Sequence, residues 1–448
     1  MPELTYSRVN RDLLRTLETP GRRYFLLIGV LLMGVAFFAF SEFTQIYRGM
    51  GMSGKTIPVG WAVYITTFVF WVGIGHAGTL ISAILYLFGA RWRTAVYRSA
   101  EMMTVFAVLT AGLFPLIHLG RSWYFYWLVP YPNQRELWPN FRSPLIWDVF
   151  AVSTYLTVSS MFLFLGLIPD LAAIRDRARG WRKKLYTVLS LGWRGGDRQW
   201  RHFNAAYLFF AAFATPLVIS VHSVVSWDFT MGIVPGWHST IFAPYFVAGA
   251  IHSGLAMVIV LLVPLRKVFR LEQFLEIHHF EQMSKLMIAT GLIIGYAYGI
   301  EFFVAWYSGN EFEWSAFVHR AFGAYWWMFW AMVLFNCVLP MLFFFRNVRR
   351  SFFWLVTISV LVNVGMWFER FVIIAVSLMH DYDPATWQFK YEFTWVEAGI
   401  LGGSFCWFLS WFFIFAKIFP TVSMMEIKEA MPPPLKKAPP PAGQGAHA

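Results

Sequence analysis

Long runs of apolar residues, separated by short polar stretches, dominate this chain of 448 residues. A helix needs about 20 such residues to cross the hydrocarbon core of a bilayer. Ten runs reach that length, at 24–45, 59–89, 96–119, 144–168, 203–226, 241–265, 284–306, 319–345, 352–376 and 395–419. The pattern predicts an all-α polytopic membrane protein with ten transmembrane helices.

The composition supports a membrane protein and excludes a soluble one, because 58% of the residues are hydrophobic and only 13% are charged. The net charge of +12 could indicate a nucleic-acid partner. However, the basic residues fall in alternate loops, which is typical of membrane topology. We therefore expect lipids around the chain and no nucleic acid.

The distribution of lysine and arginine predicts the orientation. Basic residues gather before the first apolar run and after the second, fourth, sixth and eighth runs. The positive-inside rule then places both termini in the cytoplasm, in the inner membrane of a bacterium. Residues 1–23 are polar and basic without an apolar stretch, so we expect a cytoplasmic segment there and no signal peptide. The proline-rich residues 420–448 are expected to form a cytoplasmic tail.

A weak internal repeat divides the chain. Residues 70–93 align with residues 245–270, so that His76 falls near His252, and a second alignment places Glu101 with Glu281. The repeat predicts two parallel four-helix bundles, formed by runs 2–5 and 6–9 and flanked by runs 1 and 10. The expected divisions are 24–226 for the first helix with the first bundle, 241–376 for the second bundle, and 395–419 for the tenth helix.

One pair of ionisable residues stands out at the outer end of the first bundle. His118 lies about one turn before the end of the third helix, which Arg121 and Trp123 mark as the water interface, and Asp148 lies about one turn after the start of the fourth. Ser143 and Pro144 are typical of an N-cap and a first helical residue, so the fourth helix should begin there. Ionisable groups inside a membrane are costly, so they are candidates for function.

The repeat also indicates that this pair is not a symmetric structural feature. His118 aligns near Tyr298, and Asp148 near Trp326 or Trp327, so the second bundle lacks the pair. This asymmetry favours a site in the first bundle. The alternative is a histidine–aspartate pair that only holds two helices together.

Several neighbouring residues would suit a quinol headgroup, which offers two hydroxyl groups across a flat apolar ring. Tyr64, Thr67 and Trp71 share one helix face, and His222 lies near the outer end of the fifth run. His118 and Asp148 are usable bases that could accept the two hydroxyl protons and pass them outward through Arg121 and Asp228. Ordinary packing is the alternative for each of the supporting residues.

A second set of polar residues lies deeper in the membrane. His76, Glu101, His252 and Glu301, with Asp228 at the outer end, could form a proton path. Hydrogen-bonded helix packing beside small residues is the leading alternative for the two histidines. Haem ligation is disfavoured because these histidines belong to different bundles. The only cysteines, Cys337 and Cys406, cannot supply the four thiolates of an iron–sulfur cluster, so we expect neither haem nor cluster in this chain.

With ten helices in two parallel bundles and no cofactor-ligand pattern, the chain resembles the NrfD/polysulfide-reductase membrane-subunit family over about residues 24–420. The contexts "HLGR" and "SPLIWD" around His118 and Asp148 are most similar to the quinol-oxidising (ActC) subunit of bacterial alternative complex III. The resemblance implies that these two residues bind menaquinol or ubiquinol near the periplasmic face. It also implies an iron–sulfur partner on that side, a multihaem cytochrome c and further membrane subunits.

Three alternatives remain open. Another NrfD-type complex, in sulfur or hydrogen respiration or in quinone reduction, would have the same fold. A secondary transporter can also have parallel repeats, but should bind its substrate near the midplane between broken helices. A haem-b membrane anchor would show a Soret band in its visible spectrum.

Overall fold

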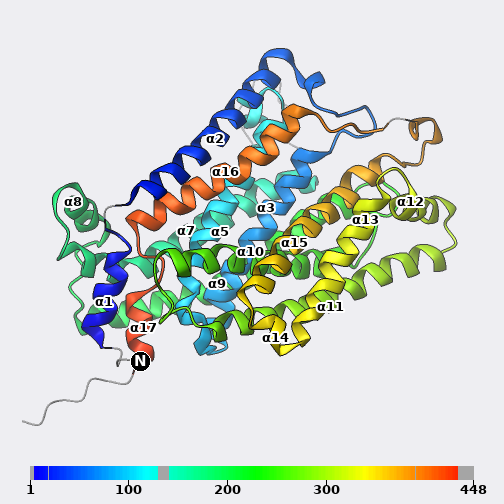
Figure 1. Cartoon of the computed structure of the whole chain (residues 1–448). Coiled ribbons are helices and arrows are strands. Elements are labelled where there is room, and N and C mark those ends of the chain that lie inside the picture. Colours follow the sequence, from blue (N-terminus) through cyan, green and yellow to red (C-terminus); the bar gives the residue numbers. More distant parts are fainter. Residues whose placement is uncertain (1–4, 19, 130–140, 389, 432–448) are drawn as a thin grey trace, which may run out of the picture.

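The computed structural model describes residues 5–18, 20–129, 141–388 and 390–431, and these residues form helices joined by short loops, with no strand among them (Figure 1). Ten helical segments of this part are long and apolar enough to cross a membrane, which confirms the predicted fold class. They are Arg22–Arg48, Val63–Leu87, Tyr97–His118, Pro144–Arg175, Asp197–Thr230, Phe242–Val268, Ile277–Tyr307, Trp326–Phe344, Phe352–Val376 and Trp395–Ile418.

Most spanning segments are single helices, and four are made of consecutive pieces. The single helices are α2 (Arg22–Arg48), α7 (Pro144–Arg175), α9 (Asp197–Thr230), α10 (Phe242–Val268), α11 (Ile277–Tyr307) and α16 (Trp395–Ile418). The composite ones are α3 (Val63–Thr79) with η2 (Leu80–Ile84) and α4 (Leu85–Leu87), α5 (Tyr97–Ala111) with α6 (Leu113–His118), α13 (Trp326–Val333) with η5 (Leu334–Val338) and η6 (Leu339–Phe344), and α15 (Phe352–Phe371) with η7 (Val372–Val376).

Shorter helices occupy the two ends of the molecule. They are α1 (Tyr6–Arg15), η1 (Met50–Met52), η3 (Arg91–Ala95), η4 (Ser122–Leu128), α8 (Gly180–Leu189), α12 (Glu311–Phe322), α14 (Arg346–Arg349), η8 (Pro384–Thr386) and α17 (Met424–Ala430).

The predicted eighth run, 319–345, was wrong at its start. Residues up to Phe322 belong to the separate helix α12, and the spanning helix begins only at Trp326. Gly323 ends α12 with a ψ of −157°, which is outside the helical range. A Cβ at Gly323 would overlap the carbonyl oxygen of His319, so the chain can turn this tightly only with glycine at that position.

The helices contact one another in two groups. In the first group α3 packs on α5, α5 on α7, α7 on α9, and α9 returns to α3. In the second group α10 packs on α11 and α15, and α13 packs on α15. The two groups meet mainly where α10 contacts α3 and α9, and α15 also contacts α3. Helices α2 and α16 lie side by side, with α16 against α3 and α5 (Figure 1).

Small residues let the helices at these interfaces approach closely. A Cβ at Gly254 of α10 would overlap Ala77 of α3, and one at Gly78 of α3 would overlap the backbone of Ala100 in α5. Such small-residue contacts are typical of helix packing in membranes. In the same way, a Cβ at Gly403 of α16 would overlap Phe38 of α2, a helix near the start of the chain.

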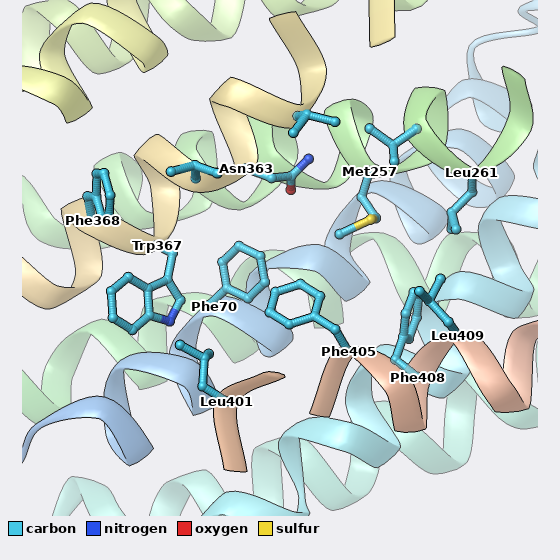
Figure 2. A pocket seen from close by; sticks show the side chains of 13 residues that line it. Phe70, Met257, Leu261, Asn363, Trp367, Phe368, Leu401, Phe405, Phe408 and Leu409 are labelled. Carbon is cyan, nitrogen blue, oxygen red and sulfur yellow. The ribbon is translucent and has the colours of Figure 1, made fainter. Parts of the chain in front are cut away.

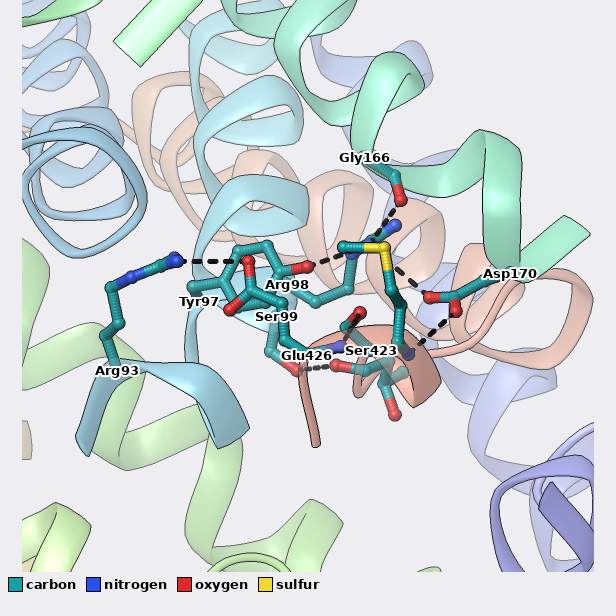
Figure 3. A network of polar contacts seen from close by, with 10 residues as sticks. Arg93, Tyr97, Arg98, Ser99, Gly166, Asp170, Ser423 and Glu426 are labelled. Carbon is teal, nitrogen blue, oxygen red and sulfur yellow. Dashed lines mark hydrogen bonds and ion pairs between the residues drawn. The ribbon is translucent and has the colours of Figure 1, made fainter. Parts of the chain in front are cut away.

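The C-terminal helix α17 is fixed to the first group by buried charges (Figure 3). Arg93 of η3 lies 3.0 Å from Glu426 of α17, and Arg98 of α5 lies 3.4 Å from Asp170 of α7. Asp170 also accepts a hydrogen bond of 3.2 Å from the backbone N–H of Met425. Burial raises the pKa of Glu426, and the neighbouring Arg93 opposes that rise. The predicted proline-rich tail lies outside the described residues from 432 onward.

Candidate functional site

A cavity of about 510 Å³ opens at the end of the first helix group where α6 ends and α7 begins. Its volume is within the usual range for small-molecule sites. Four lining residues have a polar side chain, namely His118, Asp148, Ser153 and Asp228. The remaining lining residues are apolar or glycine: Trp61, Ile65, Phe68, Gly112, Pro115, Leu116, Leu119, Phe125, Leu128, Val129, Leu145, Val149 and Val152.

The local backbone explains how the two predicted residues reach one cavity. Helix α6 ends at His118, and Gly120 then takes a φ of +70°, which is favourable only for glycine among the common residues. Helix α7 begins at Pro144 with Ser143 as its N-cap residue, as predicted, although the Ser143 side chain makes no capping hydrogen bond. Asp148 therefore lies one turn inside α7, where it is 7% exposed.

A second carboxyl group stands beside Asp148. Asp228, near the end of α9, is in hydrogen-bonding contact with Asp148, and both line the cavity. The Oδ1 atom of each residue has no further partner among the described residues. A hydrogen bond between two carboxyl groups needs one proton between them, because an ionised carboxylate only accepts.

The other polar wall of the cavity is His118, whose ring also contacts a lysine that does not line the cavity. Lys55, in the segment between η1 and α3, has its Nζ atom 2.8 Å from Nδ1 of His118. Lys55 also lies over the ring of Tyr64, with Nζ 4.8 Å from the ring centroid. Burial lowers the pKa of Lys55 to about 8, and the nearby carboxyl groups of Glu397 and Glu42 oppose this fall.

A network of amide and hydroxyl groups fixes this back wall. Gln45 of α2 accepts a hydrogen bond from the Tyr64 hydroxyl group and donates one of 3.2 Å to the carbonyl oxygen of Ile117. Gln45 Nε2 also lies 3.3 Å from Glu42. The network therefore ties α2 and α3 to the residue that directly precedes His118.

The family model described as polysulphide reductase, NrfD matches residues 51–380, which is most of the chain and includes the whole cavity. The chain belongs to the NrfD family. It is a multi-pass integral membrane protein, as that family and the ten spanning segments require.

Three relatives of this NrfD-family chain differ in how much they share with it. A putative membrane subunit of a dimethyl sulfoxide reductase from Halobacterium salinarum is 29% identical over 252 residues, 56% of this chain and 53% of that protein. The match thus spans about half the length of that relative. A selenate reductase subunit from Mesobacillus selenatarsenatis is 22% identical, over 65% of this chain and 67% of that protein. An Hdr-like menaquinol oxidoreductase integral membrane subunit of Archaeoglobus fulgidus is 20% identical, over 80% and 81%.

The other residues that we predicted for a quinol site lie around this NrfD cavity without lining it. Tyr64 bonds to Gln45, and Trp71 donates a hydrogen bond of 3.1 Å to Ser404 of α16. Thr67 accepts one of 3.2 Å from the Trp367 indole. Arg121 follows α6 and is exposed.

His222 lies deeper, beside His76. The two ring centroids are 4.5 Å apart at an angle of 62°, and both residues are buried. His76 is also 2.7 Å from the carbonyl oxygen of Val72, whereas neither nitrogen of His222 has a hydrogen-bond partner in the described part of the chain. The structure thus places His222 with the deep polar residues.

The remaining residues of the predicted proton path are separate from one another. His252 contacts Thr290 of α11 at 2.8 Å, in the second helix group. Glu101 is buried in the first group and lines a small internal cavity with Ser82. Glu301 is buried in the second group, near Arg320. These contacts form no continuous chain of hydrogen bonds among the described residues.

A second cavity, of about 320 Å³, lies between α3, α10, α15 and α16 (Figure 2). Figure 2 shows Phe70, Met257, Trp367 and Phe405 around it. No lining residue is ionisable, and Asn363 is the only one with an amide group. This cavity suits a hydrocarbon chain and offers no group that could accept a proton from a substrate.

Three residues on the side of His118 away from the cavity were not predicted from the sequence, namely Lys55, Glu42 and Gln45. One signal was present, because Lys55 is an isolated lysine in the loop "GMSGKTIPVG", on the side of the chain where basic residues are few. A lysine at such a place is an exception to the positive-inside pattern and therefore a candidate for a specific contact.

Proposed function

We propose that this chain is the quinol-oxidising membrane subunit of a respiratory complex, and that the cavity between His118 and Asp148 holds the quinol headgroup. The observation that carries the proposal is the arrangement of polar groups in the cavity. An imidazole on α6 and a carboxyl pair on α7 and α9 line an otherwise largely apolar cavity. A quinol needs a flat apolar space with one hydrogen-bonding group for each of its two hydroxyl groups.

Oxidation of a quinol to a quinone releases two protons and two electrons. His118 takes one proton, and the pair formed by Asp148 and Asp228 takes the other, since an imidazole and a carboxylate can both serve as general bases. The electrons pass to an iron–sulfur or haem centre in a partner subunit, because Cys337 and Cys406 are too few to hold a cluster in this chain.

The direction of proton release follows from the predicted orientation. With both termini in the cytoplasm, the end of the bundle that carries His118 and Asp148 faces the periplasm, and the basic loops face the cytoplasm. Proton release at that face, coupled to electron transfer, would contribute to the membrane potential.

One relative supports a quinol substrate. Of the three relatives, the one with the longest match, from Archaeoglobus fulgidus, is named as the integral membrane subunit of a menaquinol oxidoreductase. We propose menaquinol or ubiquinol as the substrate here. The complex that we propose is of the alternative-complex-III type, with an iron–sulfur subunit on the periplasmic side, a multihaem cytochrome c and further membrane subunits.

Quinone reduction in another NrfD-type complex is the second candidate. Two relatives are named as subunits of a dimethyl sulfoxide reductase and a selenate reductase. Within the same cavity, His118 and the carboxyl pair would then donate protons to a quinone instead of accepting them. The net direction of electron transfer in the purified complex, measured with a quinol and with a quinone, separates the two candidates.

The variant Asp148→Asn tests the proposal. We expect quinol-driven electron transfer to fall by about 10²- to 10⁴-fold, the usual contribution of a general base, while the complex remains assembled. Glu311→Gln is a suitable control because Glu311 is an exposed acid of α12, away from the cavity. Normal quinol turnover in Asp148→Asn would refute the assignment of the site.

A further inference from the structure

The contact between Lys55 and His118 constrains which ring nitrogen can face a substrate. Nδ1 of His118 lies 2.8 Å from Nζ of Lys55, so Nε2 is the nitrogen left for the cavity that His118 lines. The side chain of Lys55 has no other hydrogen-bond partner than His118 among the described residues. Because the two groups share one hydrogen bond, the position of the proton on one of them decides whether the other donates or accepts.

This hydrogen bond can run in either direction, and each direction gives His118 a different chemical role. A protonated Lys55 donates to Nδ1, so the proton of a neutral His118 is on Nε2 and the ring offers a donor to the cavity. A neutral Lys55 accepts from Nδ1–H, so Nε2 has a free lone pair and can act as a base. Only the second arrangement can take a proton from a quinol.

We propose that Lys55 is a positioning residue that sets the tautomer of His118 and receives the proton that His118 takes from the quinol hydroxyl group. This inference rests on the proposed function. In the step, the quinol O–H bond breaks and Nε2 of His118 gains the proton, while Nδ1–H is lost to neutral Lys55. The electrons leave to the oxidising centre of the partner subunit, as above. His118 then presents Nε2–H to the carbonyl oxygen of the quinone product.

Two carboxyl groups near Lys55 could accept the proton that it receives from His118. Glu42 of α2 and Glu397 of α16 both interact with the ammonium group. The Oε2 atom of Glu397 accepts 3.1 Å and 3.2 Å hydrogen bonds from the backbone N–H groups of Gly54 and Thr394. Oε1 of Glu397 and Oε1 of Glu42 are buried and have no partner among the described residues. Each therefore offers a free acceptor atom for a proton that leaves Lys55.

The charged and titratable groups around Lys55 come from every element packed against it. They are Glu42 of α2, Tyr64 of α3, His118 of α6 and Glu397 of α16. Because the pKa of Lys55 is lowered to about 8, the neutral form is a minority near pH 7 and grows as the pH rises. The rate of quinol oxidation should therefore increase with pH and level off above about 8.

The test compares Lys55→Met and Lys55→Arg in the purified complex, with a reduced short-chain benzoquinone or naphthoquinone as the donor. In Lys55→Met we expect turnover to fall by about 10-fold and the rise toward pH 8 to disappear, because no group at position 55 titrates. In Lys55→Arg we expect a loss of about 100-fold at every pH with little change in KM, since a guanidinium group stays protonated and fixes Nε2 as a donor. Lys184→Met, at an exposed site on α8, is the control for loss of a lysine charge.

Which of the two variants retains more turnover distinguishes the proposed role of Lys55 from that of a fixed positive charge. If Lys55 only supplied a positive charge between Glu42 and Glu397, arginine would retain activity and methionine would not. That result, or an unchanged pH profile in Lys55→Met, would overturn the inference while leaving the quinol site intact. Wild-type turnover in both Asp148→Asn and His118→Gln would instead refute the proposed function itself. Thermal unfolding of each purified variant shows whether it has folded.

Discussion

Asp228 on α9 holds its carboxyl group against that of Asp148 on α7, 80 positions earlier in the chain, and both side chains line one cavity. Two carboxyl groups in hydrogen-bonding contact act as one unit, because the proton between them belongs to both. The pair can therefore accept a proton at Asp148 and release one from Asp228. Asp228, which we predicted only on the outward proton path, therefore lines the cavity beside Asp148.

Replacement of Asp228 should slow quinol oxidation less than replacement of Asp148. In Asp228→Asn the amide group can still donate a hydrogen bond to Asp148, so the position of Asp148 is kept, but the shared proton is lost. We expect turnover to fall by about 10-fold, and the double variant Asp148→Asn with Asp228→Asn to be no slower than Asp148→Asn alone. Steady-state quinol oxidation measures both. Losses that multiply in the double variant would show that the two residues act independently.

His222 should be dispensable for quinol oxidation. Both of its ring nitrogens are buried without a hydrogen-bond partner in the described structure, and it does not line the cavity. Phenylalanine has a similar shape and no polar atom to leave unsatisfied, so His222→Phe should keep turnover within about 2-fold and unfold at the same or a higher temperature. His222→Ala, which removes packing as well, should unfold at a lower temperature. A loss of turnover in a well-folded His222→Phe complex would contradict this prediction and show that His222 takes part in quinol oxidation.

The contact between α2 and α16 depends on a glycine. A Cβ at Gly403 would overlap Phe38 of α2, whereas a Cβ at Gly402, the preceding residue, meets nothing within 4 Å. Gly403→Ala should therefore destabilise the protein by about 1–3 kcal/mol, the usual cost of overpacking, and Gly402→Ala should not. Thermal unfolding in detergent compares the two. Equal midpoints would mean that α2 and α16 separate at little cost.

A stacked histidine pair at the end of α12 should make the nearby packing sensitive to acid. His380 stacks on Trp387, with ring centroids 3.8 Å apart, and on His319 at 4.6 Å. Burial and the neighbouring His319 lower the pKa of His380 from 6.5 to about 4. Between these values the unfolded chain binds more protons than the folded one, so this packing is fully stable above pH 6.5 and weakens as the pH falls toward 4.

Hydrogen exchange in residues 377–388 measures this effect. We expect faster exchange at pH 5 than at pH 7, after correction for the intrinsic exchange rate. In His380→Phe, which keeps an aromatic ring at position 380 but removes its titrating group, the difference should be much smaller. His202→Phe, at an exposed site on α9, is the matched control and should behave as the wild type. Exchange that is independent of pH in the wild-type protein would contradict the prediction.

The sequence predicted the spanning helices well, because membrane spans produce the strongest and longest signal that a chain can have. The eighth began at a different residue, because the predicted run included the last residues of α12, and the tight turn at Gly323 separates these from the spanning helix. Pro144 marked the start of α7 correctly, because proline suits the first helical position. Both signals are local in the chain.

The site was predictable only in part. His118 and Asp148 stood out as ionisable residues inside apolar runs, and the structure brings both to one cavity. The support of His118 by Lys55 joins residues 63 positions apart across a loop, and no periodicity in the sequence reports such a contact. The same holds for His222, because its contact with His76 depends on how α9 packs against α3 and cannot be read from its position along the helix.

The pairing of α2 with α16 has a consequence for how the protein is made. The first spanning helix enters the membrane hundreds of residues before its neighbour is synthesised, so it must remain in lipid without its permanent partner until the tenth arrives. Glu397 reaches Gly54 and Lys55 only at that stage. A nascent or truncated chain that lacks α16 would therefore carry an unfinished wall behind His118, and competence for proton transfer would be acquired only when the last helix inserts.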